Sequence, residues 1–442
     1  MNDVIPDGWS NPKLDDIVTK FQNGYAFSAK GYVPEGIPII SMGSIQLDGT
    51  FKKNNTKLKY WDAAAKEDLS RYLVKSEDLI MAMTDVTPTM ELIGRACIVK
   101  GNGEYFLNQR VGLISVDEEK SSKPFLSYLT NFNQWRSYCI GSSGLGAQAN
   151  LGTSQILDGS ILLPPLPEQQ KIAAILSSVD EVIEKTQAQI NKLKDLKTGM
   201  MQELLSPREG QAANINNPQG ESKNSLHHIE FKDSPLGRIP VGWEVAKFKD
   251  VFVDYKYGPR FSSKDYSPNG NVKTIRGTDV ANNGEVHYQQ VPTAQIDADT
   301  VEAHKLKDGD LVMITTADCG ASAVFREQNI PYIASAYAIK LTPTNKVIPA
   351  YIKFFMQTSN AMTQIESFIR KGTVANLPGS DVMNIELALP PIKSQEKISS
   401  ILNALEDKIE LVIKKNIQLK RTKKALMQDL LTGKVRVKVD AA

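Results

Sequence analysis

Two stretches of the chain repeat one another, and this repeat constrains the fold more than any other feature. Residues 164–205 and 390–431 align without a gap at a separation of 226 residues. Each stretch begins with a double proline and predicts one long helix, about 58 Å for about 39 residues at ~1.5 Å each. A repeat of this length indicates a duplicated architecture. Equivalent residues include Pro164 and Pro390, Gln169 and Gln395, and Leu205 and Leu431.

The repeat extends into the segments before the helices. Trp9 follows Ile-Pro-Asp-Gly, and Trp243 follows Ile-Pro-Val-Gly. The offset between equivalent residues falls from 234 at these tryptophans to 226 at Gly94 and Gly320, as small loop insertions would produce. The predicted segments are a first globular domain at 1–163, a central coiled-coil helix at 164–205, a flexible linker at 206–238, a second globular domain at 239–389, and a distal coiled-coil helix with a C-terminal tail at 390–442.

Both globular domains are expected to belong to the α/β (α+β) class. Short apolar runs bounded by turn signals predict strands, and helical spacing after a proline predicts one helix in each domain. The expected strands are residues 79–83, 96–99, 111–116, 159–163, 311–314 and 336–341, and the expected helices are residues 124–138 and 349–369.

Apolar residues recur along both long helices at alternating steps of four and three. This spacing predicts a coiled-coil seam. Asn416 stands where the first helix has Ile190, and a single buried Asn specifies register at some cost in stability. The seam residues are Ile172, Leu176, Val179, Ile183, Ile190, Leu193 and Met200 in the first helix, and Ile398, Leu402, Leu405, Ile409, Asn416, Leu419 and Leu426 in the second.

Two interpretations of the seam are open. In one, the helices only hold the two halves of the chain together. In the other, they form a rigid spacer between two globular domains and pack antiparallel about an internal pseudo-two-fold axis. The duplication favours the second interpretation. Two similar domains at a fixed separation suit a two-part site on duplex DNA, whose half-sites lie about one helical turn apart, ~34–36 Å, or a multiple of it.

Composition limits the class of protein. The hydrophobic fraction of 41% and the charged fraction of 23% are those of an ordinary globular protein. The net charge is only +2, although a local basic face suffices for DNA binding. The 3 scattered cysteines favour a reducing cytosol over a disulfide framework or zinc site. Because neither a secretory signal nor a long apolar run is present, a cytoplasmic location is expected.

Motifs for nucleotide hydrolysis and methyl transfer are missing from the sequence. The Gly433-Lys434 pair lacks the upstream glycine of a Walker A loop. The amino-methylating signature, which is Asn or Asp followed by two prolines and an aromatic residue, is also missing. Leu163 and Leu389 precede the two Pro-Pro pairs instead. The sequence therefore predicts no catalytic residue.

Two further segments have an ordinary interpretation. The glycine-rich residues 141–146 are interpreted as a flexible loop rather than a nucleotide-binding loop, because they lack the G-x-G-x-x-G order. His227 and His228 are interpreted as a solvated linker pair rather than a metal site, because no further ligand lies near them in the sequence. No metal is expected.

The start of the first long helix carries a family resemblance. Residues 163–172, Leu-Pro-Pro-Leu-Pro-Glu-Gln-Gln-Lys-Ile, resemble the specificity subunit of type I restriction–modification enzymes. The helix end at 201–205, Met-Gln-Glu-Leu-Leu, the second copy at 389–434 and the two-domain layout match as well. One departure is Lys-Ser-Gln-Glu at 393–396, where the first copy has Pro-Glu-Gln-Gln.

The resemblance implies two target-recognition domains, each of which reads one half of a bipartite DNA sequence. The helices would set the gap and dock two methyltransferase (M) subunits, and restriction/translocase (R) subunits would join them. This chain would be a non-catalytic subunit of a restriction endonuclease and adenine-N6 DNA methyltransferase complex. It would hold no cofactor, while S-adenosylmethionine is expected on the M subunits and ATP and Mg on the R subunits.

Candidate DNA-binding residues follow from side-chain chemistry. Arg and Lys read guanine, Asn and Gln read adenine, and accessible cations hold phosphates. For each candidate the alternative is a solvated surface charge. Arg260 is the strongest, because it stands in a Gly-Pro turn beside Phe261 where the first copy has Ala26. The candidates are Lys52, Lys53, Asn55, Lys57, Arg95 and Arg110 in the first domain, and Lys256, Tyr257, Arg260, Arg276, Arg370 and Lys371 in the second.

The leading hypothesis is a DNA-binding specificity subunit. The alternative is a coiled-coil scaffold that joins proteins without binding DNA, and salt-dependent binding to duplex DNA would separate the two. A third hypothesis, an enzyme that acts alone, would require methyl transfer or DNA cleavage by the purified chain.

Overall fold

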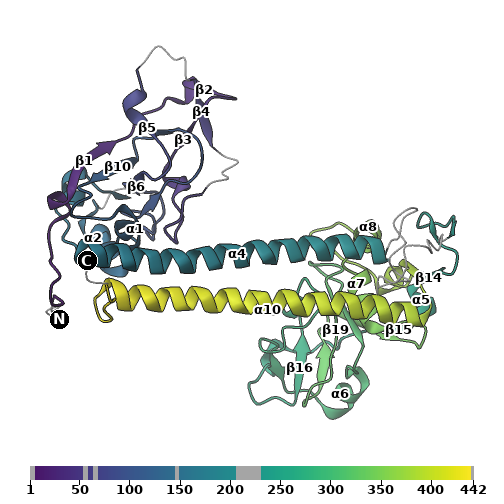
Figure 1. Ribbon diagram of the computed structural model, residues 1–442. Helices are drawn as coiled ribbons and strands as arrows, with labels where there is room; N and C mark the ends of the chain where they lie inside the picture. The colour runs from purple at the N-terminus through teal and green to yellow at the C-terminus, as the bar shows by residue number, and fades with distance from the viewer. Residues whose placement is uncertain (1–4, 53–57, 63–67, 145–148, 206–229, 440–442) are drawn as a thin grey trace. The chain divides into compact units, whose positions relative to one another are not determined.

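The structure is a computed structural model that describes residues 5–52, 58–62, 68–144, 149–205 and 230–439. The chain divides into two compact units (Figure 1). Unit 1 comprises residues 1–187 and 414–442, and unit 2 comprises residues 188–413. The division passes through both long helices, α4 (Leu166–Leu205) and α10 (Ile392–Leu431). Each unit therefore contains one globular domain and part of both helices.

Unit 1 is built on two larger sheets and one short one. Its strands are β1 (Val18–Asn23), β2 (Tyr32–Val33), β3 (Ile37–Ile40), β4 (Lys59–Trp61), β5 (Leu73–Val74), β6 (Leu79–Ala82), β7 (Thr84–Asp85), β8 (Ala96–Ile98), β9 (Tyr105–Leu107), β10 (Val111–Val116) and β11 (Ala149–Asn150). The sheet orders are β1-β10-β6-β8, β2-β4-β3-β9-β5 and β11-β7. The shorter helices are α1 (Lys123–Leu129), α2 (Asn133–Ser142) and α3 (Thr153–Leu157).

Unit 2 repeats this plan. Its strands are β12 (Phe231–Lys232), β13 (Ile239–Pro240), β14 (Glu244–Lys247), β15 (Phe252–Tyr257), β16 (Val272–Ile275), β17 (Thr293–Ala294), β18 (Leu311–Ile314), β19 (Ser322–Val324), β20 (Tyr332–Ala334), β21 (Ala338–Pro343) and β22 (Glu386–Leu389). The sheet orders are β15-β21-β18-β19, β17-β16-β20, β14-β22 and β12-β13. The shorter helices are α5 (Phe248–Val251), α6 (Ala298–His304), α7 (Pro349–Phe355), α8 (Ser359–Phe368) and α9 (Gly379–Val382).

The four-stranded sheets of the two units correspond strand by strand. The β1–β10 pair aligns Asn23 with Gly112, and the β15–β21 pair aligns Tyr257 with Ile339. The central strands β6 and β18 are buried at every residue, which explains their continuous apolar runs. The repeat in the sequence is thus a repeat of the fold, and the chain has an α+β architecture with two domains.

One expected strand is almost missing. Residues 159–163 form only two isolated bridges, from Ser160 to Lys13 and from Leu163 to Ser10. The prediction of a regular strand was therefore wrong. The apolar residues Ile161 and Leu163 are buried, so the short apolar run that suggested a strand comes from packing rather than from a ladder.

The helix expected at 124–138 and its counterpart in unit 2 are each divided in two, as α1 with α2 and α7 with α8. The side-chain amide of Asn131 donates to the Ser127 carbonyl at 2.7 Å, and that of Gln357 donates to the Lys353 carbonyl at 3.0 Å. Such side-chain hydrogen bonds compete with the continuing backbone ladder of a helix. The prediction of single helices was wrong because the apolar spacing continues across the break.

The core of each unit is completed by the end of the helix that belongs to the other repeat. In unit 1 the cluster around Leu79 includes Leu430 and Leu431, the last residues of α10. In unit 2 the main cluster includes Leu204 and Leu205, the last residues of α4. Burying one leucine contributes about 1.5–3 kcal/mol. Each globular domain therefore depends on a helix that starts in the other repeat.

The last part of the predicted flexible linker is folded. β12 pairs with β13, so that Phe231 lies opposite Pro240. Gly237, with a φ of +90°, and the Ser234 hydroxyl, which donates to the Gly237 carbonyl at 2.5 Å, close the turn between them. The prediction of flexibility was wrong for residues 230–238, because this turn joins two strands. Residues 206–229, which include the histidine pair, lie outside the described residues.

The sequence predicts no disulfide, no metal site and no membrane span, and the following observations on each concern the described residues. Cys97, Cys139 and Cys319 are free thiols. Across the described ranges, no group of three or more His, Cys, Asp or Glu side chains is placed to hold a metal ion. None of the described helices combines the length and the apolar character needed to cross a membrane.

Candidate nucleic-acid interface

A buried glutamine fixes the start of α4 in unit 1. Gln169 Nε2 donates to the carbonyl oxygens of Pro164 and Lys120, each at 2.9 Å. Its Oε1 accepts from the backbone N–H of Ser122 at 3.0 Å. The side chain is fully buried, and both its donors and its acceptor are satisfied. We call this arrangement the glutamine anchor.

The glutamine anchor recurs in unit 2. Gln395 Nε2 donates to the carbonyls of Pro390 at 2.9 Å and Lys346 at 3.0 Å, and its Oε1 accepts from Ile348 N–H at 2.9 Å. Each partner lies 226 residues after its counterpart in unit 1. The glutamine thus joins each helix to its globular domain, and the sequence departure at 393–396 leaves this contact intact.

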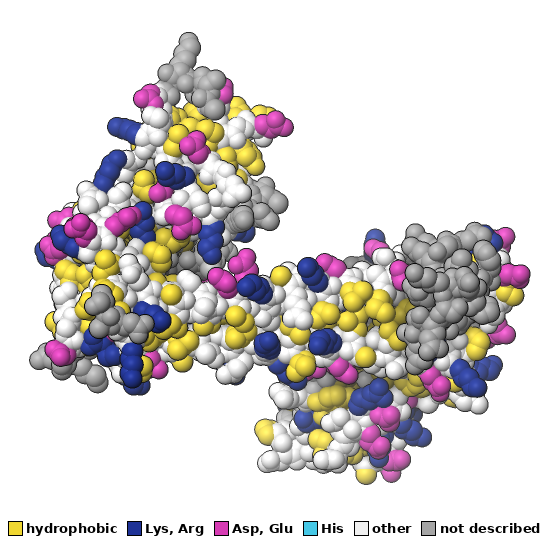
Figure 2. Space-filling view, viewed as in Figure 1, with side chains coloured by type: hydrophobic (Ala, Val, Ile, Leu, Met, Phe, Trp, Pro, Cys, Tyr) yellow, Lys and Arg dark blue, Asp and Glu magenta, His cyan; other side chains and the backbone are white. Residues whose placement is uncertain are grey.

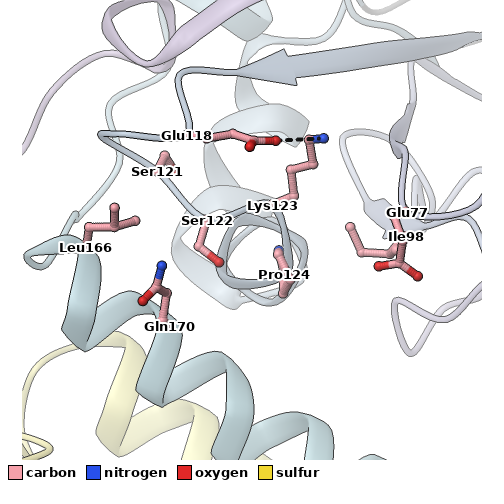
Figure 3. A pocket seen from close by; sticks show the side chains of 9 residues that line it. All are labelled: Glu77, Ile98, Glu118, Ser121, Ser122, Lys123, Pro124, Leu166 and Gln170. Carbon is pink, nitrogen blue, oxygen red and sulfur yellow. Dashed lines mark ion pairs between the residues drawn. The ribbon is translucent and has the colours of Figure 1, made fainter. Parts of the chain in front are cut away.

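A small hollow lies beside the anchor of unit 1 (Figure 3). Its volume is about 320 Å³, and its lining includes Gln170, the neighbour of Gln169. Lys123 and Glu118 form an ion pair of 3.2 Å within the lining. Gln170 is exposed, whereas Gln169 is enclosed, so the two adjacent glutamines have different environments.

The predicted seam residues are buried or half-buried at every position. Side chains on the outer faces of the helices are more accessible, with Leu196 50% and Leu411 63% exposed. In unit 1 the buried Asn416 donates from Nδ2 to Gln187 Oε1 at 2.9 Å. Within the described residues the Oδ1 atom of Asn416 has no hydrogen-bond partner, so this polar residue reduces the stability of the helix pair.

An ion pair joins the two helices of unit 1. Lys423 Nζ on α10 lies 2.7 Å from Asp180 Oδ1 on α4 and 5.5 Å from the ring centroid of Tyr128. The Tyr128 hydroxyl donates to Asp180 Oδ2 at 2.8 Å. Together with the Asn416–Gln187 contact, this pair shows that α4 and α10 run antiparallel within unit 1.

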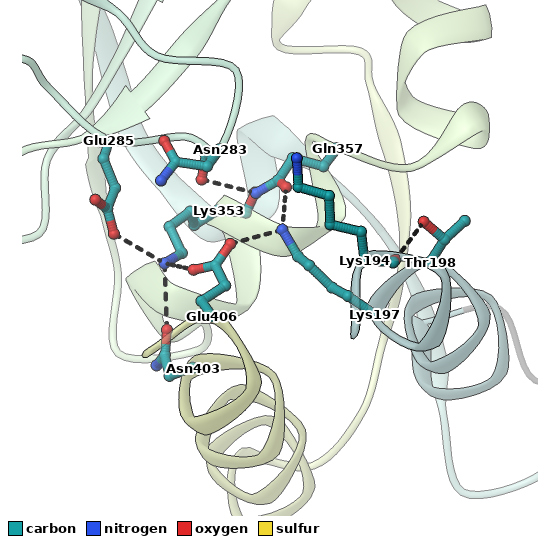
Figure 4. Close-up of polar contacts among 9 residues, drawn as sticks. All are labelled: Lys194, Lys197, Thr198, Asn283, Glu285, Lys353, Gln357, Asn403 and Glu406. Carbon is teal, nitrogen blue, oxygen red and sulfur yellow. Dashed lines mark hydrogen bonds and ion pairs between the residues drawn. The ribbon is translucent and has the colours of Figure 1, made fainter. Parts of the chain in front are cut away.

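The equivalent contact in unit 2 is a larger polar cluster (Figure 4). Lys197 Nζ lies 2.6 Å from Glu406 Oε1, and Lys353 Nζ lies 2.7 Å from Glu406 Oε2. The side chains of Lys197, Lys353 and Glu406 are only 15%, 9% and 14% exposed. Lys353 Nζ also donates to Asn403 Oδ1 at 3.2 Å and lies 3.5 Å from Glu285 Oε1. We call this group the unit 2 lysine cluster.

These two contacts are copies of one arrangement. Glu406 corresponds to Asp180 and Lys197 corresponds to Lys423, each at the 226-residue offset. The aromatic residue is retained as well, because Lys197 Nζ lies 5.7 Å from the ring centroid of Phe354, the counterpart of Tyr128. Interhelical ion pairs of this kind help to specify which register two helices adopt.

The C-terminal tail is tied to the start of α4 in unit 1. Arg436 donates from Nε and Nη2 to the two carboxylate oxygens of Glu168, each at 2.8 Å. The Trp9 indole N–H donates to Glu168 Oε2 at 3.1 Å. Burial raises the pKa of Glu168, but hydrogen bonds from Arg436 and Trp9 more than offset this and leave the pKa below its usual value. We call this arrangement the carboxylate clamp.

Of the unit 1 candidates for DNA binding, the structure describes Lys52, Arg95 and Arg110. Lys53, Asn55 and Lys57 lie outside the described residues, and Lys52 is exposed. Arg95 is half-buried, and its Nη1 donates to Asn131 Oδ1 at 3.1 Å. This guanidinium is thus engaged in the fold.

Arg110 is also half-buried, but its guanidinium, unlike that of Arg95, is not paired with a described side chain. Its backbone carbonyl accepts from Met83 N–H at 3.0 Å, while no described side chain pairs with its guanidinium.

Figure 2 shows cationic and anionic side chains interspersed on the visible face, as expected from the small net charge.

The structure brings several unit 2 candidates together at one end of the β15–β21 pair. The Tyr257 hydroxyl accepts from Gly379 N–H at 2.9 Å, which joins β15 to the segment that carries Arg370 and Lys371. Both of these cations are exposed, although Arg370 Nη2 lies 3.4 Å from Asp381 Oδ2. Arg260 is exposed on the loop after β15.

The side chains of two unit 2 candidates form hydrogen bonds within the protein. Asp279 is buried. Arg276 donates from Nε to Asp279 Oδ2 at 3.0 Å and from Nη2 to Asp279 Oδ1 at 3.1 Å. Lys256 Nζ donates to the Ala303 carbonyl at 2.7 Å. Arg276 therefore stabilises a turn. Its residue type alone did not distinguish it from the accessible cations.

Two residues outside the predicted set stand out. Arg136 is buried, and its Nη2 donates to the Met90 carbonyl at 2.6 Å. Burial, reinforced by the charge of Arg95, lowers the pKa of Arg136 to about 10, so it remains charged at neutral pH. Tyr337 is 66% exposed on the turn between β20 and β21. The sequence did not single out either residue as a candidate, because Arg136 lies within the helix predicted at 124–138 and Tyr337 within the strand predicted at 336–341.

A groove of about 1320 Å³ lies in unit 2. It is lined by α4, α8 and two loops, and its walls include Met201, Ala321 and Met362. Arg95 and Arg136 occupy the equivalent positions of Ala321 and Met362 in unit 1, at the 226-residue offset. The two units thus share a framework but differ in side-chain charge at this place.

Comparison with known proteins assigns both repeats to one family. The family described as type I restriction modification DNA specificity domain matches residues 6–195 and 240–421. The chain belongs to this family. Type I specificity subunits are the DNA-binding, non-catalytic components of restriction–modification complexes, and this assignment confirms the resemblance noted at residues 163–172.

Individual relatives support the assignment to the specificity subunits. The putative type I restriction enzyme MjaX specificity subunit of Methanocaldococcus jannaschii is 27% identical, covering 98% of this chain and 95% of its own. The MjaVIII specificity subunit of the same organism is 30% identical over 63% of this chain and 62% of its own. The crystal structure of a type I S subunit from M. genitalium has the same fold, with a TM-score of 0.57, 14% identity and 96% coverage of both chains.

Proposed function

We propose that this specificity subunit reads a bipartite target on duplex DNA, with one half-site for each globular domain. The observation that supports this most is that each repeat matches a DNA specificity domain by itself, at residues 6–195 and 240–421. The strand framework is common to both units, whereas exposed loop residues differ. Different half-sites require different base contacts on equivalent scaffolds.

The two long helices set the gap between the half-sites in this proposal. The Lys423–Asp180 pair in unit 1 and the Lys197–Glu406 pair in unit 2 support it, because a slip of one helix turn, ~5.4 Å, would separate each lysine from its carboxylate. A fixed helix register gives a fixed length.

The outer faces of the helices dock two M subunits, and R subunits join this core. Exposed apolar side chains such as Leu196 and Leu411 support a docking role, because such residues mark protein contacts when they gather on one surface. The M subunits bring S-adenosylmethionine and the R subunits bring ATP and Mg, while this chain binds no cofactor. The complex acts in the cytoplasm.

Methylation mapping tests the bipartite target. The chain is expressed with its M subunits in a host that lacks other DNA methyltransferases, and modified adenines are located by single-molecule sequencing. We expect two short half-sites separated by a constant gap. Modification at a single continuous site would contradict the proposal, and an absence of salt-dependent DNA binding by the assembled complex would favour a protein scaffold.

Two variants separate the roles of domains and helices. Replacing residues 1–163 with the same domain of another family member is expected to change one half-site only. Inserting four residues near one end of α4 is expected to change the gap and leave both half-sites intact. A changed gap after the domain exchange, or changed bases after the insertion, would contradict this division.

A further inference from the structure

The turn before the central strands β10 and β21 has the same backbone construction in both units. Met83 N–H donates to the Arg110 carbonyl at 3.0 Å, and Thr315 N–H donates to the Tyr337 carbonyl at 2.8 Å. Arg110 and Tyr337 therefore occupy equivalent positions. The next strand residues agree, because the carbonyls of Val111 and Ala338 each accept from a β-strand neighbour, Gly24 or Gly258, at 3.1 Å.

This turn is held rigidly on its other side as well. Val111 N–H donates to the Asn108 carbonyl at 2.9 Å, and Ala338 N–H donates to the Ser335 carbonyl at 3.0 Å. A Cβ atom on Gly24 would lie 2.2 Å from the Asn108 carbonyl oxygen, so the neighbouring strand approaches as closely as glycine permits. A side chain at this position thus projects from a backbone that is fixed from two directions.

The side chains at this position differ between the two units, and neither pairs with another described side chain. Tyr337 is 66% exposed, and Arg110 is half-buried. Within the described ranges, neither the Tyr337 hydroxyl nor the Arg110 guanidinium has a side-chain partner. By contrast, the guanidinium groups of Arg95 and Arg276 are bonded to Asn131 and Asp279.

The surroundings of Tyr337 suit a nucleic acid. Thr315 links the turn to the cationic segment of unit 2, because its N–H donates to the Tyr337 carbonyl and its own carbonyl accepts from Leu377 N–H at 2.7 Å. The exposed residues Arg370 and Lys371 lie on the same connected segment. Cations bind phosphates without sequence preference, so sequence must be read by other side chains that contact the bases.

We propose that this turn is a base-reading position shared by the two units, occupied by Arg110 in unit 1 and by Tyr337 in unit 2. The proposal rests on the bipartite reading of DNA proposed above and names one residue of each half. A rigid backbone with an exchangeable side chain is a suitable device for reading different bases. Arg forms paired hydrogen bonds with guanine O6 and N7. Tyr offers a hydroxyl as donor and acceptor and an aromatic ring for apolar contact.

The test uses the complex assembled with its M subunits and a library of targets randomised at one base pair at a time. Domain exchange first assigns each half-site to a unit. We expect Tyr337→Ala to relax base preference at one or two positions of the unit 2 half-site. Binding of the intact target should fall about tenfold or more. Arg110→Ala should do the same in the unit 1 half-site. Tyr337→Phe and Arg110→Lys, which keep the bulk or the charge, separate base contact from loss of folding.

Ile330→Ala provides a matched control. Ile330 is 43% exposed and precedes β20, whereas the Tyr337 turn follows that strand, so the two sites lie at opposite ends of β20. We expect wild-type binding for this variant. Wild-type preference at every base pair in both the Tyr337 and Arg110 variants overturns the proposal. A uniform loss of affinity for all sequences overturns it too, because it would indicate phosphate contact. Failure of the wild-type complex to read two half-sites instead rejects the proposed function itself.

Discussion

At the scale of single residues, the glutamine anchor makes a buried polar side chain indispensable. Gln169 satisfies two carbonyls and one N–H that would otherwise lie without partners beside the start of α4. Gln395 does the same in unit 2. The repeat shows that glutamine recurs at this position, but the reason for it becomes clear only from the hydrogen bonds.

We expect Gln169→Leu to lower the free energy of unfolding of unit 1 by about 3 kcal/mol. Three backbone groups lose their partner, and each loss costs at least ~1 kcal/mol in a buried site. Urea unfolding followed by tryptophan fluorescence measures this, since Trp9, Trp61 and Trp135 all lie in unit 1. Gln170→Leu is the matched control and should change stability by less than about 0.5 kcal/mol. Equal stability of the two variants would contradict the anchor.

The carboxylate clamp predicts a dependence of stability on pH. The folded-state pKa of Glu168 is lower than the usual value of 4.5, so its ionised form stabilises the fold fully above that pH. This contribution is lost as pH falls through the lowered pKa. We expect Arg436→Gln to lower Tm at pH 7, and we expect the difference from wild type to shrink below about pH 4.5.

Thermal unfolding between pH 7 and pH 3 checks this prediction. Lys434→Gln serves as the control, because Lys434 forms only an exposed ion pair with Asp429 at 3.5 Å. Its effect on Tm should be small throughout. A difference between wild type and Arg436→Gln that persists unchanged into acid would show that Glu168 ionisation is not its source.

At the scale of elements, the predictable features are those with a long period. The 226-residue offset and the four-three spacing predicted α4 and α10, and continuous apolar runs predicted β6 and β18. The breaks between α1 and α2 and between α7 and α8 could not be predicted, because the amides of Asn131 and Gln357 act on carbonyls without altering the apolar pattern.

The same limit applies to the candidate interface. The sequence identified Arg95 and Arg276 as cations but could not show that Asn131 and Asp279 hold them. It missed Tyr337, because the apolar run at 336–341 predicted a strand there, whereas the structure places Tyr337 on the turn before β21.

The unit 2 lysine cluster predicts a large effect from one carboxylate. We expect Glu406→Gln to destabilise unit 2 by about 3 kcal/mol, because two mostly buried lysines would lose their shared partner. Hydrogen exchange of unit 2 amides, or urea unfolding, measures the change.

Glu181→Gln is the comparison for that variant. Glu181 pairs with Lys185 at 3.4 Å, and both side chains are mostly exposed, so its removal should cost less than about 0.5 kcal/mol. Similar costs for the two substitutions would mean that the cluster contributes no more than a surface ion pair.

At the scale of the whole molecule, the two units differ in how the chain contributes to them. Unit 2 is one continuous segment, 188–413, whereas unit 1 combines residues 1–187 with 414–442. We expect deletion of residues 414–442 to remove hydrogen-exchange protection from β6 and β10 and to leave β18 and β21 protected. Deletion of 432–442 alone should have a smaller effect, since Leu430 and Leu431 remain in the core. Equal protection of both sheets in the longer deletion would contradict this.

The discontinuity of unit 1 has a consequence for synthesis on the ribosome. The first domain to be translated lacks Leu430, Leu431 and Arg436 until after all of unit 2 has been synthesised. Unit 2 has all of its residues once residue 413 has been added. We therefore expect unit 2 to become resistant to protease at a shorter chain length than unit 1, which limited proteolysis of stalled chains of increasing length would reveal. A premature stop between residues 413 and 430 would thus disable the globular domain that is synthesised first.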